Sequence, residues 1–90
     1  MKVELVGPLI QLAGVRVIEV ELGGPVALED ALSKLPPNLR RHILSEEGSI
    51  NPGLIVLVNG ADVRSLTGGD FLVSDEDTLT VIPAIHGGLP

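Results

Sequence analysis

The chain contains no cysteine, no tryptophan and no tyrosine, and Phe71 is its only aromatic residue. The absence of cysteine excludes disulfides, thiolate metal sites and a thiol nucleophile. The near absence of aromatic side chains leaves no surface on which nucleic-acid bases could stack. Basic residues are also scarce, since six Lys and Arg stand against twelve Asp and Glu, a formal net charge of −6. Phosphate binding needs a basic face, so we expect no nucleic-acid partner and favour a partner with a positive surface.

Long apolar runs are missing as well. No stretch approaches the ~20 apolar residues that cross a bilayer, and no signal-peptide core follows Met1. We therefore expect a soluble, cytoplasmic protein with no membrane partner. The 90 residues are 44% hydrophobic and 20% charged, a balance typical of one globular domain. We place that domain at residues 1–86 and a flexible C-terminal tail at 87–90.

The first part of the chain shows the two-residue alternation of strands. Val3–Val6 begins a strand, and the apolar segment Leu9–Leu12 is expected to continue it up to a turn at Ala13–Gly14. Val15–Leu22 alternates again, with apolar residues on one side and glutamates on the other. The two segments predict a hairpin with one face on the core and one face in water.

The period changes after the turn formers Gly23, Gly24 and Pro25. Apolar residues then recur at i, i+3, i+4 and i+7, a spacing that predicts the one main helix; they are Leu28, Ala31, Leu32 and Leu35. Pro36–Pro37 ends that helix. We expect Asn38 to cap a short second helical turn that carries Leu39 and Ile43 inward.

The second half predicts three more strands. Leu54–Val58 is continuously apolar, which favours a strand buried on both sides, and Asn59–Gly60 is a strong tight-turn signal before a return through Ala61–Val63. A short strand is then predicted at Phe71–Val73 and an acidic turn at Ser74–Asp77. The last strand is predicted at Thr78–Ile82. One helix must cover one face of the resulting sheet. The order predicts an α+β fold of the β-grasp (ubiquitin-like) type, a mixed sheet of four to five strands with its first and last strands side by side.

Side chains that could carry chemistry are isolated from one another. Neither His42 nor His86 has a nucleophile and an orienting acid nearby in the sequence, so we expect no catalytic residues. Asp75–Asp77 with Asp70 lacks the ligand spacing of a calcium loop, so we interpret it as an exposed acidic turn and expect no metal site.

The glycine pairs separate into two kinds. Gly23–Gly24 and Gly68–Gly69 lie where turns are needed, whereas Gly87–Gly88 closes no turn between elements. Glycine has no Cβ, so such a tail can thread a narrow channel in a partner. A carboxylate on Gly88 would be unhindered and open to activation, but Leu89–Pro90 follow it and hold it in a peptide bond.

The segment Asp75–Gly88 resembles the end of the ubiquitin-like sulfur carrier proteins, the family of the molybdopterin synthase small subunit and the thiamine-pathway carrier. Members end in an acidic turn, a last strand with a proline, and a diglycine. Leu9–Gly14 looks like the first turn of the family, and Leu57–Gly60 looks like the end of its third strand.

The resemblance implies a carrier without catalytic residues or a bound cofactor. An adenylating enzyme related to ubiquitin-activating enzymes, of the kind that serves the molybdopterin and thiamine pathways, would use ATP to form an acyl-adenylate on Gly88. Sulfur would then displace AMP and leave a thiocarboxylate, with Gly87 as the flexible neighbour. Docking of the tail's root against the partner is assigned to Ile82, Pro83, Ile85 and His86.

The leading hypothesis is a carrier for molybdopterin (molybdenum cofactor) biosynthesis, with the large subunit of molybdopterin synthase as a further partner and a protease that removes Leu89–Pro90. Three alternatives stay open. The chain could modify lysines of other proteins through Gly88, it could carry sulfur for the thiamine pathway or tRNA thiolation, or it could be a β-grasp interaction module with an inert terminus.

Overall fold

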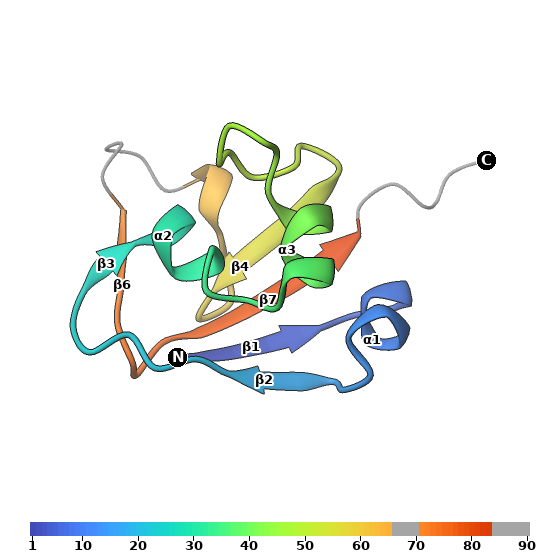
Figure 1. Cartoon of the computed structure of the whole chain (residues 1–90). Coiled ribbons are helices and arrows are strands. Elements are labelled where there is room, and N and C mark those ends of the chain that lie inside the picture. The colour runs from blue at the N-terminus through green and yellow to red at the C-terminus, as the bar shows by residue number, and fades with distance from the viewer. Residues whose placement is uncertain (66–70, 84–90) are drawn as a thin grey trace.

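A computed structural model describes residues 1–65 and 71–83 of the chain (Figure 1). Three helices, a 3-10 turn and seven strands make up this part. In chain order they are β1 (Lys2–Leu5), α1 (Pro8–Ala13), β2 (Val17–Glu19), β3 (Val26–Ala27), α2 (Leu28–Leu32), α3 (Pro37–Ile43), β4 (Leu54–Val58), β5 (Ala61–Asp62), the 3-10 turn η1 (Val63–Ser65), β6 (Leu72–Val73) and β7 (Thr78–Pro83). None of the helices in these residues is long and apolar enough to cross a membrane.

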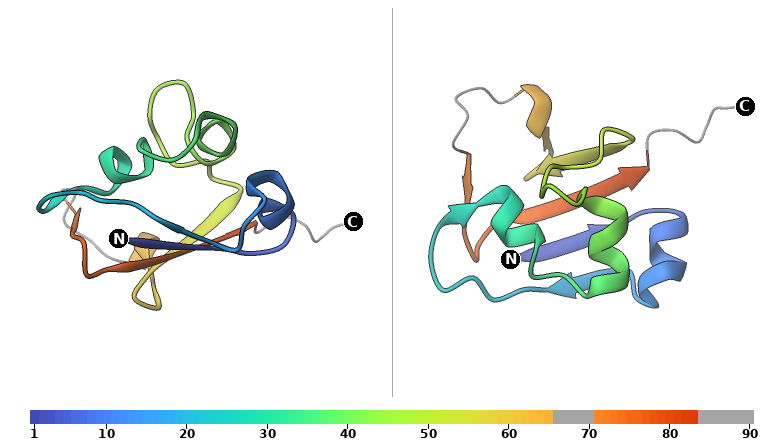
Figure 2. Two further views of the ribbon diagram at one scale, coloured as in Figure 1. Left: turned by 60° about the horizontal axis from the view of Figure 1, so that its bottom comes forward. Right: turned by 45° about the horizontal axis from the view of Figure 1, so that its top comes forward.

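The main sheet has five strands in the order β2-β1-β7-β4-β5. The central pair, β1 and β7, is parallel, with Val3 opposite Leu79, and the other pairs are antiparallel. The helices α2 and α3 cover one face of this sheet and leave the other open (Figure 2). The predicted α+β fold of the β-grasp type is confirmed, as is the position of the first and last strands side by side.

Burial alternates along the central strands, because only one face of the sheet carries helices. On β7, Leu79 and Val81 are fully buried, whereas their neighbours are half-buried. β4 follows the same pattern, with Val56 in the core and Ile55 and Leu57 half-buried on the other side. The prediction that β4 is buried on both sides was therefore wrong: its apolar residues on the open face are available for contact.

The expected main helix is shorter than predicted, and the expected second helical turn is the longer helix α3. The helix α2 has only five residues. Leu35, the last of the four apolar residues at helical spacing, lies beyond its end but is still buried. Pro37 then starts α3, because proline fits the first turn of a helix, where its missing N–H is not needed. Leu39 and Ile43 point inward as predicted, and both have no exposed surface.

The expected cap of α3 by Asn38 was also wrong. Pro36 holds the N-cap position, and no side chain caps this helix. The amide of Asn38 instead donates a hydrogen bond to the carbonyl of Leu12 at 3.1 Å. Asn38 therefore ties α3 to α1.

The segment Leu9–Leu12 was expected to continue a strand but lies in α1. Pro8 occupies the first turn of α1, and Gly14 ends it with φ +79°, a left-handed conformation that suits glycine. The N–H of Gly14 donates to the carbonyl of Ile10 at 2.8 Å. A four-residue apolar run does not distinguish helix from strand, and the proline and glycine that flank it decided the outcome.

The remaining strand predictions are confirmed: β4 has its predicted bounds, β7 is one residue longer, and β2, β5 and β6 are shorter. Only Val17–Glu19 of the expected second strand pairs with β1. Asn59 and Gly60 both have positive φ, as a tight hairpin turn requires, and β5 returns from them. The short strand β6 pairs with β3 in a separate two-stranded sheet, with Val26 opposite Val73, which the periodicity had not indicated.

Candidate functional site

The site predicted from the sequence is the C-terminal tail and its root. β7 ends at Pro83, and both Ile82 and Pro83 are half-buried where the chain leaves the sheet. The other four predicted site residues, Ile85, His86, Gly87 and Gly88, lie outside the described residues. The structure therefore describes the surface from which the tail departs.

A shallow apolar groove lies beside that point of departure. The turn between β1 and α1 forms one wall and the end of β7 forms the other, and the space is about 330 Å³. No charged side chain of the described residues lines it; the lining residues are Val6, Gly7, Pro8, Ile82 and Pro83. The groove therefore offers apolar contact at the root of the tail.

The sequence analysis missed three of these residues, because Val6, Gly7 and Pro8 are far from the tail in sequence. Val6 is a large apolar side chain that is 38% exposed, and Gly7 has φ +64°, which turns the chain into α1. The parallel pairing of β1 with β7 brings this turn to the end of the last strand. The Gly-Pro pair signalled a turn, but only the pairing places it at the tail.

The apolar surface continues from the groove onto the open face of the sheet. Ile82 lies directly opposite Ile55 on β4, and both are half-buried on the face that carries no helix (Figure 2). We call the groove residues together with Ile55 the tail-root surface. Next to it, Thr80 donates a hydrogen bond to the carboxylate of Glu4 at 3.3 Å, so the open face becomes polar towards β1.

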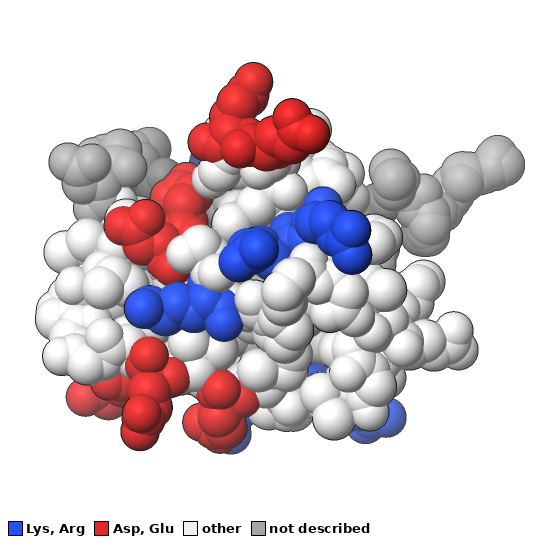
Figure 3. Space-filling model, in the orientation of Figure 1, with Lys and Arg blue, Asp and Glu red and all other residues white. Residues whose placement is uncertain are grey.

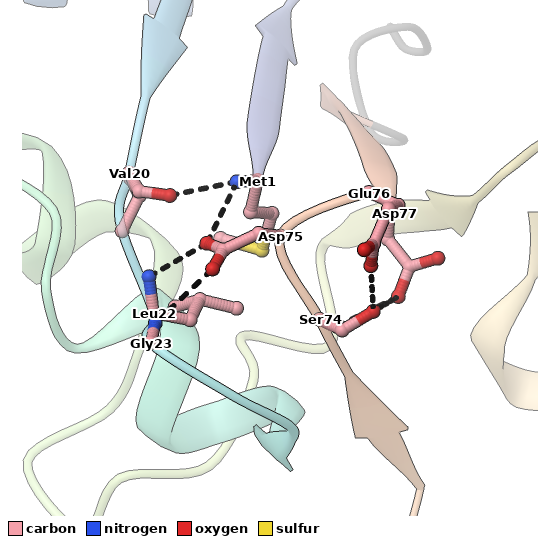
Figure 4. Close-up of polar contacts among 8 residues, drawn as sticks. All are labelled: Met1, Val20, Leu22, Gly23, Ser74, Asp75, Glu76 and Asp77. Carbon is pink, nitrogen blue, oxygen red and sulfur yellow. Dashed lines mark hydrogen bonds and ion pairs between the residues drawn. The ribbon is translucent and has the colours of Figure 1, made fainter.

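In the acidic turn before β7, the carboxylate of Asp75 stabilises the fold. Asp75 accepts hydrogen bonds from the backbone N–H groups of Leu22 at 2.7 Å and Gly23 at 3.1 Å (Figure 4). Its Oδ1 also lies 3.4 Å from the α-amino group of Met1. These donors stabilise the charged form, and the Leu22 N–H contributes most to holding the pKa of Asp75 below its usual value.

Asp77 joins the same turn to the hairpin after β4. It accepts a hydrogen bond from the amide of Asn59 at 2.9 Å and one from the backbone N–H of Ser74 at 2.8 Å. The Asn59 amide is the main reason why the pKa of Asp77 is lowered. In return, the amide oxygen of Asn59 accepts from the N–H of Thr78 at 3.0 Å. The turn thus fixes the start of β7.

The acidic residues do not converge as a set of metal ligands would. Asp75 and Asp77 bind different partners, and Asp70 lies outside the described residues. Across residues 1–65 and 71–83, no three His, Asp or Glu side chains come close enough to hold an ion. His42 is exposed on α3, with Nδ1 3.1 Å from the carbonyl oxygen of Asn38.

The architecture and the apolar surface at the root of a diglycine tail define a ubiquitin-like protein of the β-grasp class. The family model described as the ThiS family matches residues 3–88. The chain belongs to this family of ubiquitin-like sulfur carriers. The match covers nearly the whole chain and ends at Gly88.

Relatives and solved structures agree with this assignment. The chain is 32% identical to the ubiquitin-related modifier 1 homolog of Dictyostelium discoideum over 98% of both chains. Its fold is similar to SAMP1 from Haloferax volcanii, with a TM-score of 0.77 and 25% identity over 98% of both chains. It is also similar to Urm1 from Sulfolobus solfataricus, with a TM-score of 0.69 and 32% identity over 92% of this chain and 99% of that one.

A third similar structure contains a complex. The chain matches a component of the BexX/CysO complex of Amycolatopsis orientalis with a TM-score of 0.72 and 29% identity, over 97% of this chain and 98% of that one.

Proposed function

We propose that this protein carries an activated acyl group on Gly88, first as an acyl-adenylate and then as a thiocarboxylate. The observation that carries the proposal is the family match, which runs to Gly88 itself. The tail-root surface supports it, because a partner that acts on the tail can hold the apolar groove beside Pro83. The activating partner is an adenylating enzyme related to ubiquitin-activating enzymes.

The division of labour follows from the side chains that are present. An acyl donor needs a reachable carboxylate and little bulk, and glycine supplies both. The catalytic groups and the ATP site belong to the enzyme, while this chain contributes the docking surface and the glycyl carboxylate. It needs no bound cofactor for this task.

Activation requires a free carboxylate on Gly88, so we propose that Leu89–Pro90 are removed first by a protease. In the 90-residue sequence the carbonyl of Gly88 is part of a peptide bond, so it has no carboxylate oxygen that could attack the α-phosphate of ATP and displace pyrophosphate. The trimmed chain is therefore the active form.

The relatives favour a carrier of the ubiquitin-related modifier type. The relative from Dictyostelium discoideum reported above bears that name, which supports joining of Gly88 to lysines or delivery of sulfur, as in tRNA thiolation. The similarity to Urm1 from S. solfataricus also supports a carrier of this type. Molybdopterin biosynthesis, with the synthase large subunit as partner, is the second candidate and rests on the resemblance of Asp75–Gly88 to that family's tail.

The test compares two chains that differ only at the end. Chains of residues 1–88 and 1–90 are incubated with ATP, a sulfur donor and the adenylating enzyme encoded in the same genome, and intact masses are recorded. The 1–88 chain should gain AMP and then exchange one oxygen for sulfur, while the 1–90 chain stays unchanged. A 1–88 chain that gains neither group would overturn the proposal.

A further inference from the structure

The chain contains two lysines, Lys2 and Lys34, and the fold places them in different electrostatic surroundings. Both side chains are exposed, and among the described residues neither ammonium group makes a hydrogen bond or an ion pair. An exposed, unengaged amine is the nucleophile that an acyl donor of this kind meets. The two lysines are therefore the complete set of side-chain amines that a second copy of the chain could use.

Lys2 lies among acidic residues on the open face of the sheet. It stands opposite Glu19 of β2 in the antiparallel register, and Glu4 follows two positions along β1 on the same face. Strand residues two apart point to the same side, so both carboxylates share the face of Lys2. A donor chain with a net charge of −6 is repelled from this region.

Lys34 lies in the link between α2 and α3, on the side of the sheet that carries the helices. The carbonyl of its neighbour Ser33 accepts a hydrogen bond from the guanidinium of Arg40 at 3.2 Å, which holds that cation beside the link. Arg41 is exposed on the same helix, while the exposed carboxylates of Glu29 and Asp30 lie on α2 five and four positions before Lys34, so that three cations stand beside two anions here. Lys34, Arg40 and Arg41 are half of the basic residues of the chain, and we call them the basic band.

On the helix-bearing side of the molecule, blue side chains cross the middle of the view, with red groups above, below and beside them (Figure 3). A concentration of cations on an otherwise acidic protein attracts an acidic partner to that place. The attraction acts over about one Debye length, ~8–10 Å at moderate salt, and salt weakens it. The positive charge of the basic band therefore attracts an acidic donor chain to Lys34 more than to Lys2.

We propose that Lys34 is the preferred acceptor of the Gly88 acyl group of a second copy, so that the protein joins to itself through one defined isopeptide linkage. This inference rests on the proposed function, because it needs an activated Gly88. An acceptor engaged at Ile55 and Ile82 of its tail-root surface also keeps Lys34 free, because these two residues face away from the helices between which Lys34 lies.

The chemistry is a simple acyl transfer. The uncharged Nζ of Lys34 attacks the carbonyl carbon of Gly88, and a C–N bond forms. The bond from that carbon to the leaving group breaks, and AMP departs from an adenylate or a thiolate from a thioester with the bonding electrons. The extra proton on nitrogen passes to water or buffer, so no oxidant or reductant takes part.

A chemical donor tests the inference without any enzyme. The chain of residues 1–88 is prepared as a Gly88 thioester of mercaptoethanesulfonate and mixed with unactivated 1–88 chain at low salt. Trypsin cleaves the donor after Arg64, so each branch carries residues 65–88 and can be assigned by mass spectrometry. The proposed function is tested separately by the adenylation assay, so failure of one is distinguishable from failure of the other.

Three acceptor variants give the expected pattern. Lys34→Arg keeps the charge and should remove most of the joined product, whereas Lys2→Arg should leave it unchanged. Arg41→Glu keeps the nucleophile and should slow branching at Lys34 about fivefold, an effect that added salt abolishes, as expected of electrostatic steering. Thermal unfolding of each variant checks that it is folded. Equal branching at both lysines, preference for Lys2, no joined product, or a rate unaffected by Arg41→Glu would each overturn the inference.

Discussion

Ile82, the penultimate residue of the last strand, lies directly opposite Ile55 on β4. This pair joins the groove at the root of the tail to the open face of the sheet. The apolar side chains next to the tail are therefore positioned by the two best-paired strands of the fold. A partner that docks there contacts side chains held in place by the sheet.

The first prediction concerns docking at this surface. Ile82→Ser should lower the rate of adenylation of the 1–88 chain about tenfold at limiting concentration, because apolar anchors at an interface commonly contribute more than about 1 kcal/mol each. The effect should appear in KM more than in kcat, and it is measured with the adenylating enzyme and ATP. Leu72→Ser is the matched control, since Leu72 is 54% exposed on β6 and lies outside the tail-root surface. An equal loss in both variants would contradict the assignment.

The second prediction concerns the core under α3. Leu39 has no exposed surface, so Leu39→Ala should lower the free energy of unfolding by about 2–5 kcal/mol, through lost burial and the cavity left behind. Leu72→Ala, which truncates an exposed leucine, should change it by less than about 0.5 kcal/mol. Urea denaturation of the two variants measures both values. Similar midpoints would show that α3 does not pack as described.

The third prediction concerns the acidic turn. Asp75→Ala should lower the melting temperature, because the N–H groups of Leu22 and Gly23 lose their acceptor. Asp75→Asn should lower it less, since an amide oxygen can still accept one of these hydrogen bonds. Thermal unfolding at neutral pH compares them with Glu46→Gln, a charge-matched change on an exposed loop residue. Hydrogen exchange at Leu22 and Gly23 should accelerate in Asp75→Ala, and unchanged exchange would refute this role.

The fourth prediction follows from the lowered pKa values of Asp62, Asp75 and Asp77. The unfolded chain takes up protons at these groups at a higher pH than the folded chain does, so stability falls as the pH drops. The stabilising contribution is complete above the usual carboxyl pKa near 3.8 and is lost as the pH falls through the lower folded values. Urea midpoints from pH 7 to about pH 3 measure this loss. In the double variant Asp75→Asn with Asp77→Asn, the urea midpoint should fall less as the pH is lowered. A fall as large as in the unchanged protein would contradict the role of these two carboxylates.

Periodicity predicted most of the strands because their inward residues alternate. The pattern Leu79, Val81 against Thr78, Thr80 is that of a strand with one covered face, and the structure confirms it. The helix at α1 was missed because Leu9–Leu12 is too short to show a period. The flanking Pro8 and Gly14 were the usable signals, as a proline at the first turn and a glycine after the last.

The docking surface was predicted only in part, for a reason of topology. Ile82 and Pro83 adjoin the tail in sequence and were identified from it. Val6 and Pro8 reach the same groove through the parallel β1–β7 pair, and Ile55 reaches the adjoining face through the β4–β7 register. Long-range pairings of this kind depend on which strands associate, and local propensity does not encode them.

The sequence alone determined the chemistry that this protein can offer: a diglycine before Leu89–Pro90, no cysteine, and two lysines in a chain of net charge −6. These are properties of composition and covalent order, so no fold can alter them. The tertiary structure decided where the chemistry is presented. Pairing of the first and last strands assembled the tail-root surface. The helices cover only one face of the sheet, and for that reason Lys34 lies on the covered side and Lys2 on the open side.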